Sequence, residues 1–563
     1  MLNKFFDKYF YLAPLILFLG IAICYSHTLS YPFLWDDEVI VVNNPAIKRS
    51  DAIKHIFTTT LFGEKAEKGT FYRPLHVLSY IIDYKIWKLN PLGYHISNTL
   101  LHLMNTFLVL GVFLLIGVSR RVSFFTALLF AIHPVNTETV IYISDRGDLL
   151  FTFFSLISFV LFLKAEKIKY SFACLIAFLL ALFTKESALV VPFIMGLYTV
   201  TISKNKKNLY PVLSVLLTIA SIYIVIQLGY THAKTSQTLS TIVYASFWQR
   251  LLTFPRIIFT YLYLMVVPVR LHMEYLFVVK NILSIHFWYS MIFLGVISFV
   301  AVKNKILNKK NIFYIGWFLI GLGPFYNIVL TLAATVREHW VYFPSIGFLV
   351  LLVLFYKYIL SFIKYKYLKY ALVVIYLLYF MSYTILRGTD WGSPLSLYEH
   401  DVKYEPLSFT LHNNVGVEYY RLGRIDDAEK SFQKAIEVSP SKSFGMAFSN
   451  LGAIYERKGQ FEMALKYYEN AKKVDNLPLI YDNLANIYLR FNMLDKARSL
   501  LEEGVNAYPL NVSLWFKLAA AYYNSNMFRK AYFSFKRVEQ LRPNYLTTRQ
   551  AIANLEKRFQ SLA

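Results

Sequence analysis

Hydropathy divides the chain into a long apolar part and a polar tail. Up to about residue 388, apolar stretches recur that are long enough to cross a bilayer as helices of ~20 residues. Beyond it, a pattern of small and aromatic positions repeats about every 34 residues. We therefore predict an all-α protein, in which a polytopic transmembrane helical domain of about eleven spans precedes an α-solenoid. The predicted spans lie near 9–29, 95–117, 122–141, 147–164, 170–184, 187–202, 209–228, 285–303, 311–331, 341–363 and 369–387.

The composition agrees with a membrane protein. Of 563 residues, 56% are hydrophobic and 16% are charged, whereas soluble domains are nearer 45–50% and ~25%. These values exclude a soluble enzyme and a disordered chain. The net charge of +24 divides unevenly, with 35 basic and 15 acidic residues up to position 388 and 23 and 19 beyond it.

The basic residues of the apolar part orient it in the membrane. If there are eleven spans, 18 Lys and Arg with two acids fall in loops on one side, and such loops are typically cytoplasmic. We expect a cytoplasmic N-terminus and an extracytoplasmic tail. A crossing by the apolar stretch 247–268 would invert the later loops, so it is predicted to be re-entrant or to lie on the outer surface. The charge excess is thus a topology signal and supports no nucleic-acid partner.

The hairpin between Lys169 and Lys204 is short for two crossings. Its 34 residues reach roughly 50 Å as helix, whereas two crossings need ~60 Å. We expect its apex, with Lys185 and Glu186, to be recessed and to face a wet cavity. A self-paired turn is the alternative.

The tail carries the tetratricopeptide repeat pattern. The triplet Asn414-Val415-Gly416 recurs as Asn450-Leu451-Gly452, and Asn483-Leu484-Ala485 and Leu518-Ala519 continue it. We predict a transmembrane domain at 1–388 with its first outer loop at 30–94, a linker at 389–408, and a repeat domain at 409–563. The repeat domain would hold about four repeats and a capping helix near 544–560. Such arrays bind peptides or proteins in a concave groove, and a structural spacer is the alternative.

Three adjacent carboxylates, Asp36, Asp37 and Glu38, open the first outer loop. Because like charges repel, at least one of them should have a raised pKa. A carboxylate beside a membrane cavity can act as a general base on a hydroxyl group. A solvated loop start or a cation site remains the other interpretation.

Further polar residues gather on the same outer side of the predicted spans. Cations that converge on one cavity suit a phosphate or pyrophosphate, although each alone fits a snorkelling or helix-end charge. The sequence contains no zinc-ligand spacing, Walker loop or Rossmann glycine pattern. We therefore predict no metal ligands and no certain cofactor, and leave a divalent cation open. The residues concerned are Arg73, His102, His133, Glu138, Arg146, Asp148, Lys185, Glu186, Arg337 and Glu338.

Several motifs together resemble the GT-C superfamily of polytopic glycosyltransferases. More closely, the chain resembles the O-mannosyltransferases that join a GT-C membrane domain to tetratricopeptide repeats, and their bacterial relatives. The motifs that carry the resemblance are Trp35-Asp36-Asp37, Tyr72-Arg73-Pro74-Leu75, His133-Pro134-Val135-Asn136-Thr137-Glu138 followed by Ser144-Asp145-Arg146-Gly147-Asp148-Leu149-Leu150, Thr184-Lys185-Glu186, and Arg337-Glu338-His339-Trp340 with Tyr342 and Pro344. His339 departs from the aromatic residue expected after the Arg/Glu pair.

The resemblance implies an inverting transfer of mannose or a similar hexose from a polyprenyl-phosphate donor to a protein hydroxyl, outside the cytoplasm. Asp36 or Asp37 would be the base. The phosphate would be held by Arg73, Lys185, Arg337, His133 and Arg146. Supporting polar residues would be Glu38, His102, Glu138, Asp148, Glu186 and Glu338.

Two other classes of protein stay open. One is a ligase or polymerase of lipid-linked glycans, and the other is a non-catalytic, membrane-anchored repeat scaffold for envelope assembly. The repeats favour a protein acceptor over a glycan. The Lys- and Ile-rich composition suggests a bacterial inner membrane with periplasmic repeats.

Overall fold

The computed structural model describes residues 8–58, 61, 72–230 and 241–560, which divide into two compact units, Met1–Glu405 and Pro406–Ala563. In these described residues, helices and turns are accompanied by a single isolated antiparallel bridge between Tyr275 and Val336, and there is no strand. The all-α prediction is confirmed. Part of the predicted first outer loop, at 59–60 and 62–71, lies outside the described residues.

The first unit contains helices that are long and apolar enough to cross a membrane. Six helical stretches in the described residues could cross a bilayer, or seven if a pair bent by 50° at His133 is one span. The other predicted spans coincide with the shorter helices α8 (Arg146–Phe162), α9 (Ile168–Thr184), α10 (Val191–Thr201) and α14 (Lys309–Leu322). The count of eleven therefore stays a prediction. The six stretches are Phe10–Ser30, Pro91–Leu115, Lys206–Ile226, Ile285–Lys303, His339–Ser361 and Lys366–Asp390.

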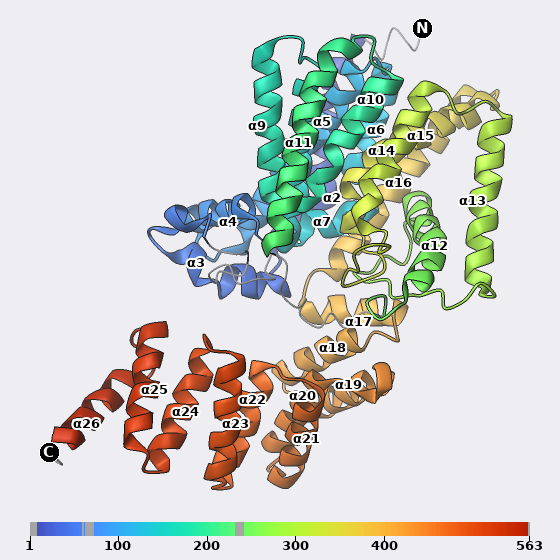
Figure 1. The fold of residues 1–563 in the computed structure, drawn as a ribbon. Helices are drawn as coiled ribbons and strands as arrows, with labels where there is room; N and C mark the ends of the chain where they lie inside the picture. The colour runs from blue at the N-terminus through green and yellow to red at the C-terminus, as the bar shows by residue number, and fades with distance from the viewer. Residues whose placement is uncertain (1–7, 59–60, 62–71, 231–240, 561–563) are drawn as a thin grey trace. The chain divides into compact units, whose positions relative to one another are not determined.

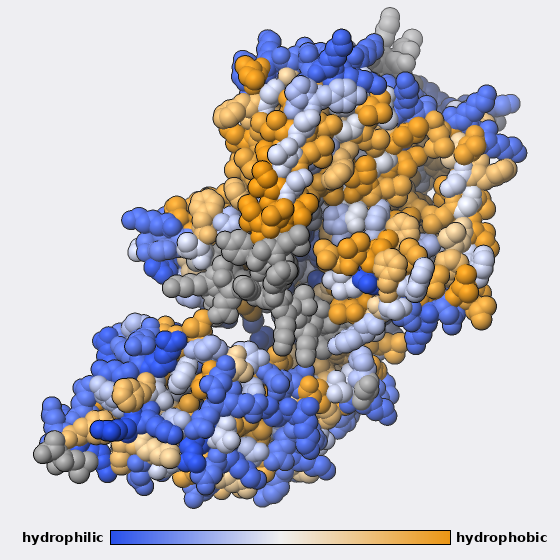
Figure 2. Space-filling model, viewed as in Figure 1, coloured by the Kyte–Doolittle hydropathy of each residue, from blue (hydrophilic) through white to orange (hydrophobic). Residues whose placement is uncertain are grey.

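Polar residues cap the two ends of this helical bundle. Figure 2 shows an apolar band across the unit, with hydrophilic residues at both ends. The chain enters near one end, while α3 (Pro45–Lys48) and α4 (Pro74–Trp87) of the first outer loop lie at the opposite end (Figure 1). This end also carries the breaks between α6 (Arg120–Ile132), α7 (Thr137–Ile141) and α8.

The first outer loop has a small core of its own. Ile40, Ile47, Val77, Tyr80 and Tyr94 are buried against one another. Burial of each large apolar side chain contributes about 1.5–3 kcal/mol. This packing fixes the loop against α5 (Pro91–Leu115) and so fixes the backbone that carries the adjacent carboxylates.

The segment 247–266 forms one continuous helix, α12 (Phe247–Val266). Ser246 and Gln249 form a capping box at its start, which satisfies two backbone N–H groups. It is not among the six stretches that could cross a bilayer. Its predicted place at the outer surface stays a prediction.

The second unit is a row of four helix pairs and a closing helix. Small residues let the two helices of a pair approach closely: a Cβ at Gly416 would lie 2.6 Å from the Phe432 ring. The pairs are α18 (Phe409–Arg421) with α19 (Ile425–Val438), α20 (Gly445–Arg457) with α21 (Phe461–Val474), α22 (Pro478–Arg490) with α23 (Leu494–Ala507), and α24 (Val512–Asn524) with α25 (Phe528–Leu541), and α26 (Thr548–Gln560) closes the row.

Candidate active site

Asp36 and Asp37 follow a turn whose backbone conformation at Trp35 is strained. Trp35 has φ +48°, a left-handed conformation that is uncommon for a bulky residue. Its ring stacks on Tyr142, with ring centroids 5.9 Å apart, and the Tyr142 hydroxyl accepts a hydrogen bond of 3.1 Å from the Asp36 N–H. Contacts with Tyr142 therefore stabilise the turn, and strained segments at functional sites are commonly stabilised by their surroundings in this way.

Asp37 is buried and anchors this turn. Its Oδ2 accepts the Leu34 N–H at 3.0 Å, and its Oδ1 accepts the Ser144 N–H at 2.8 Å and the Ser144 hydroxyl. Burial raises the pKa of Asp37 to about 7, against the lowering effect of these hydrogen bonds. Both carboxylate oxygens thus join the first loop to the segment before α8.

Asp36 is only half-buried and faces a cation. Burial raises the pKa of Asp36 above the usual 3.8, while the charge of Arg337 and a hydrogen bond with Tyr142 lower it. The two adjacent carboxylates therefore differ, since one is enclosed by backbone donors and the other lies between a cation and a phenol.

Three cations of the site are each paired with a carboxylate. Arg337 Nη2 lies 2.5 Å from Glu274 Oε1, and its guanidinium carbon lies 5.5 Å from the centre of the Trp35 ring. Arg337 Nε is enclosed without a hydrogen-bond partner among the described residues. Hence this guanidinium keeps a donor for a ligand oxygen.

The other two pairs lie around the hairpin apex. Arg73 donates two hydrogen bonds to Glu186, from Nε to Oε2 at 3.1 Å and from Nη2 to Oε1 at 2.5 Å. Lys185 Nζ lies 2.6 Å from Asp148 Oδ2. Lys185 is 7% exposed, whereas the Glu186 side chain is 42% exposed, so the apex is buried at Lys185 and partly open at Glu186. Its partners come from other segments, and the alternative of a self-paired turn is wrong.

Glu138, Asp145 and His339 meet at one point and could hold a metal ion. Their potential ligand atoms all lie within 4.8 Å of one another, and His339 Nδ1 is 2.9 Å from Glu138 Oε1 and 3.2 Å from Asp145 Oδ2. Two carboxylates and an imidazole suit a divalent transition metal. A protonated imidazole would bridge the same oxygens.

Three predicted site residues have their polar atoms occupied within the fold. His133 binds the Val135 N–H and the Met265 carbonyl, and His102 binds the Tyr342 hydroxyl and the Ala131 carbonyl. Arg146 is buried, with an ion pair of 2.6 Å to Asp83 and hydrogen bonds to Asn98, Ser79 and Tyr94. These partners occupy both ring nitrogens of His133 and four of the five N–H groups of the buried Arg146, so the phosphate-binding set of the proposal does not include them.

Two predicted carboxylates remain, Glu38 in the segment after Asp37 and Glu338 in the interior of the unit. Glu38 is half-buried and starts the first helical turn after Asp37. Glu338 is fully buried, accepts the Tyr275 hydroxyl at 3.1 Å and lies 3.7 Å from Arg387. Arg387 also binds Asp401 at 3.1 Å, so it ties the loop before α15 (Tyr342–Ser361) to α17 (Pro394–Tyr404).

The sequence predicted no site role for Tyr142, Ser144, Glu274 and Arg387. Ser144 opens one of the motifs that carry the resemblance, so its position was a usable signal. Glu274 lies beside Arg337 only because the bridge between Tyr275 and Val336 brings two distant segments together. No spacing in the chain indicates that contact.

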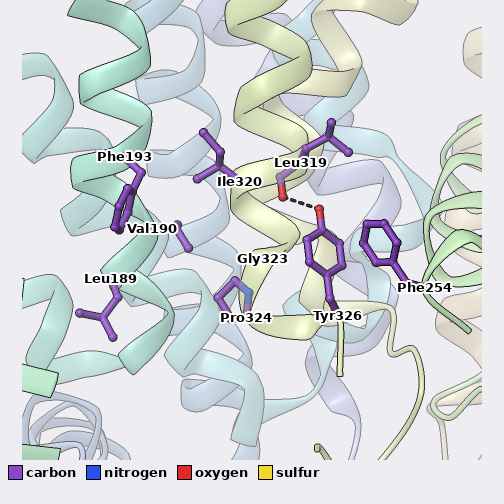
Figure 3. Close-up of a pocket in the computed structure, with 9 residues that line it drawn as sticks. All are labelled: Leu189, Val190, Phe193, Phe254, Leu319, Ile320, Gly323, Pro324 and Tyr326. Carbon is purple, nitrogen blue, oxygen red and sulfur yellow. Dashed lines mark hydrogen bonds between the residues drawn. The ribbon is translucent and has the colours of Figure 1, made fainter. Parts of the chain in front are cut away.

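An open apolar cavity of about 670 Å³ lies near the hairpin apex (Figure 3). Leu189 and Val190, at the end of the short helix that begins with Glu186, form part of its wall. Gly323 and Tyr326 line it from the segment after α14, and the Tyr326 hydroxyl donates to the Leu319 carbonyl rather than to the cavity. The lining residues are Leu189, Val190, Phe193, Phe254, Leu319, Ile320, Gly323, Pro324 and Tyr326.

Family models support the repeats of the second unit. Three tetratricopeptide repeat models match residues 410–442, 447–478 and 478–521. A solved structure described as YrrB, a TPR protein with an unusual peptide-binding site, covers 28% of this chain and 80% of its own at 19% identity and a TM-score of 0.24.

Curated relatives match the longer part of the chain. Protein O-mannosyl-transferase F38B6.6 of Caenorhabditis elegans is 27% identical over 74% of this chain and 61% of its own length. Protein O-mannosyl-transferase TMTC3 of Mus musculus is 25% identical over 87% of this chain and 59% of its own. The chain thus spans about three fifths of the length of these relatives. The predicted resemblance is confirmed: the chain is similar, along most of its length, to curated protein O-mannosyl-transferases and carries tetratricopeptide repeats.

Proposed function

We propose that the protein is an inverting membrane glycosyltransferase of GT-C type. It moves mannose or a similar hexose from a polyprenyl-phosphate donor to hydroxyl groups of a protein acceptor on the extracytoplasmic side. The observation that carries the proposal is the half-buried Asp36, which faces Arg337 at the end of the bundle where three cation–carboxylate pairs gather. The curated relatives are named protein O-mannosyl-transferases, which supports it.

Asp36 is the general base in this proposal, and Asp37 positions it. Asp37 is 1% exposed and accepts donors from Leu34 and Ser144 on its two oxygens, so it is less accessible than Asp36 to an incoming hydroxyl. Asp36 is half-buried, and burial raises its pKa. A general base works best when its pKa lies near the operating pH, so this rise improves Asp36 as a base near neutral pH. It takes the proton of the acceptor hydroxyl as the oxygen attacks the anomeric carbon.

Arg337, Arg73 and Lys185 would stabilise the phosphate that leaves. Charge that develops on the phosphate oxygens is stabilised by donors already oriented in a site that excludes water. Glu274, Glu186 and Asp148 hold these cations in place through contacts of 2.5–2.6 Å. The Nε of Arg337, which has no hydrogen-bond partner among the described residues, is a donor that the phosphate could engage once it is bound.

The apolar cavity would take the first isoprene units of the donor. It begins within one helical turn of Glu186, so a phosphate held at Arg73 and Lys185 could have its lipid chain there. Apolar lining with few polar atoms suits a hydrocarbon chain. The test is transfer of labelled mannose from mannosyl-phosphoryl-polyprenol to Ser- and Thr-containing peptides by the reconstituted protein. Label that stays on the lipid would overturn the proposed function.

Filling the cavity should weaken use of long-chain donors. A Cβ at Gly323 would meet no atom within 4 Å, so Gly323→Leu adds volume to the cavity without a clash. We expect KM for a long polyprenyl donor to rise roughly tenfold, because hydrophobic pocket contacts are worth about 1–3 kcal/mol. A donor with a single isoprene unit should be affected much less. Gly295→Leu, also in open space but outside the cavity, is the matched control. An equal effect on both donors would contradict this location.

The rate should fall in acid with a midpoint above the usual range of aspartate. The base must be ionised, and burial raises the pKa of Asp36, so activity is lost as the pH falls through that raised value. Arg337→Gln removes the charge that lowers this pKa and should move the acidic limb of kcat/KM to higher pH. Arg49→Gln, in an exposed pair, should leave the limb in place. A limb at or below pH 4 in the unchanged protein would contradict the assignment.

The repeats would hold the protein acceptor. The first Asn of a repeat triplet bonds to the residue just before the triplet of the preceding repeat: Asn450 to Asn413 at 2.8 Å, and Asn483 to Ser449 at 3.1 Å. Side-chain amides of this kind can bond peptide backbone groups of many sequences. An acceptor held near the membrane has a raised effective concentration. A cytoplasmic N-terminus and a bacterial inner membrane complete the proposal.

A further inference from the structure

Charge is distributed unevenly along the second unit. Residues 406–527 contain 14 basic and 13 acidic residues, whereas residues 528–560, which comprise α25, α26 and their connection, contain 8 basic and 2 acidic. This last segment therefore carries a net charge of +6, while the rest of the unit is close to neutral. Such a local excess needs a cause other than the topology of the membrane spans.

A large aromatic side chain lies exposed in the middle of this basic segment. Phe533 is 68% exposed on α25. The residues three and four positions before and after it, which are its neighbours on the helix surface, are all basic: Arg529, Lys530, Lys536 and Arg537. Ala531, Phe535 and Val538 form the buried face of the same helix, so Phe533 points directly away from the core of the repeats.

Packing within the array does not explain this arrangement. Terminal repeats normally present a polar outer face, and α26 already packs on the neighbouring side, where Phe559 contacts Tyr532 with ring centroids 5.8 Å apart. The single acid of α25, Glu539, is bound by Arg549. Of the four bases around Phe533, Lys536 lies 3.3 Å from Glu556, and this side chain remains 45% exposed.

We propose that the face of α25 formed by Arg529, Lys530, Phe533, Lys536 and Arg537 binds the surface of an anionic bilayer. Bases around an exposed aromatic ring are typical of helices that lie at the membrane interface, where the ring enters the headgroup region and the cations meet lipid phosphates. Each basic residue near an anionic surface contributes about a fivefold gain in partitioning. Helices of the same chain are long and apolar enough to cross a bilayer, so a lipid surface is a partner that this protein already meets.

A convex helix face favours a bilayer over an acidic protein. Phe533 lies opposite the buried side of α25 rather than in a groove, so a flat and fluid surface can surround both the ring and its basic neighbours. A folded acidic partner would need a matching concave site. The proposal concerns the second unit and does not depend on the chemistry at Asp36.

The test uses the full chain reconstituted in vesicles, with hydrogen exchange of α25 as the readout. We expect exchange in residues 528–541 to slow severalfold when phosphatidylglycerol is added to phosphatidylcholine vesicles, and this protection to disappear in high salt. Lys530→Glu with Arg537→Glu should abolish it, since removing two bases lowers partitioning by about 25-fold, before the added repulsion. Phe533→Ser should weaken it.

Matched controls keep the result interpretable. Lys430→Glu with Lys466→Glu reverses two bases on other repeats and should leave the protection unchanged. Unchanged exchange of α20 in every variant would show that the array is folded. Equal exchange of α25 in neutral and anionic vesicles would overturn the proposal. Protection by soluble polyglutamate but not by anionic lipid would also overturn it and would identify an acidic protein as the partner.

Discussion

Replacing Asp36 by asparagine should lower sugar transfer by roughly 10²–10⁴-fold, the contribution of general-base catalysis. Asparagine keeps the size of the side chain and cannot accept a proton from the acceptor hydroxyl. Because Asp36 is half-buried, and because its N–H, which Asp36→Asn leaves unchanged, bonds to the Tyr142 hydroxyl in the turn, the fold should survive. The measurement is the rate of mannose transfer at saturating donor, together with the thermal unfolding midpoint.

Two neighbouring variants separate chemistry from structure. Asp37→Asn would place an amide N–H₂ against the N–H donors of Leu34 or Ser144, so it should lower the unfolding midpoint as well as the rate. Asp51→Asn, in the exposed pair with Arg49, should change neither. A full rate for Asp36→Asn would exclude this residue as the base. A normal unfolding midpoint for Asp37→Asn would remove its anchoring role.

Arg146→Met should destabilise the membrane unit by about 3–5 kcal/mol, because it leaves Asp83 buried without its charge partner. The ion pair measures 2.6 Å, and both side chains are almost fully buried. The guanidinium also lies 4.9 Å from the centre of the Tyr80 ring and donates to Asn98. The loss should appear as a large fall in the unfolding midpoint, measured in detergent or bilayer discs.

The double variant Arg146→Met with Asp83→Leu should recover much of that loss, since it removes both charges and keeps the volume apolar. Arg49→Met breaks an exposed pair and should leave the unfolding midpoint almost unchanged. If Arg146→Met unfolded normally and instead lost donor binding, Arg146 would return to the phosphate-binding set.

The repeats could be predicted almost completely from the sequence. A Cβ at Gly416 or Gly452 would collide with Phe432 or Tyr468 of the paired helix, and Ala485 and Ala519 keep a small residue at the same position, so this constraint leaves a visible period. The all-α class followed from the length of the apolar stretches. The number of spans did not, because α14 and the two helices around Glu186 are shorter than a bilayer crossing needs.

The sequence could predict candidate residues for the site, but not which residues they contact. Asp36, Arg337 and Lys185 are polar residues at the ends of apolar stretches, which is visible in the sequence. Their partners are not, since Glu274 and Asp148 approach them through the folding of distant segments. For the same reason the sequence could not show that Arg146 is enclosed by Asp83 and Asn98.

The central claim is that this protein transfers a hexose to protein hydroxyls with Asp36 as the base. The most direct measurement is glycopeptide mass spectrometry of extracytoplasmic proteins from cells that produce the intact protein or its Asp36→Asn variant at equal levels. We predict hexose on Ser and Thr residues of a defined set of proteins with the former, and its loss with the latter. The same glycopeptides in both cells, or hexose confined to lipid-linked glycans, would contradict the account.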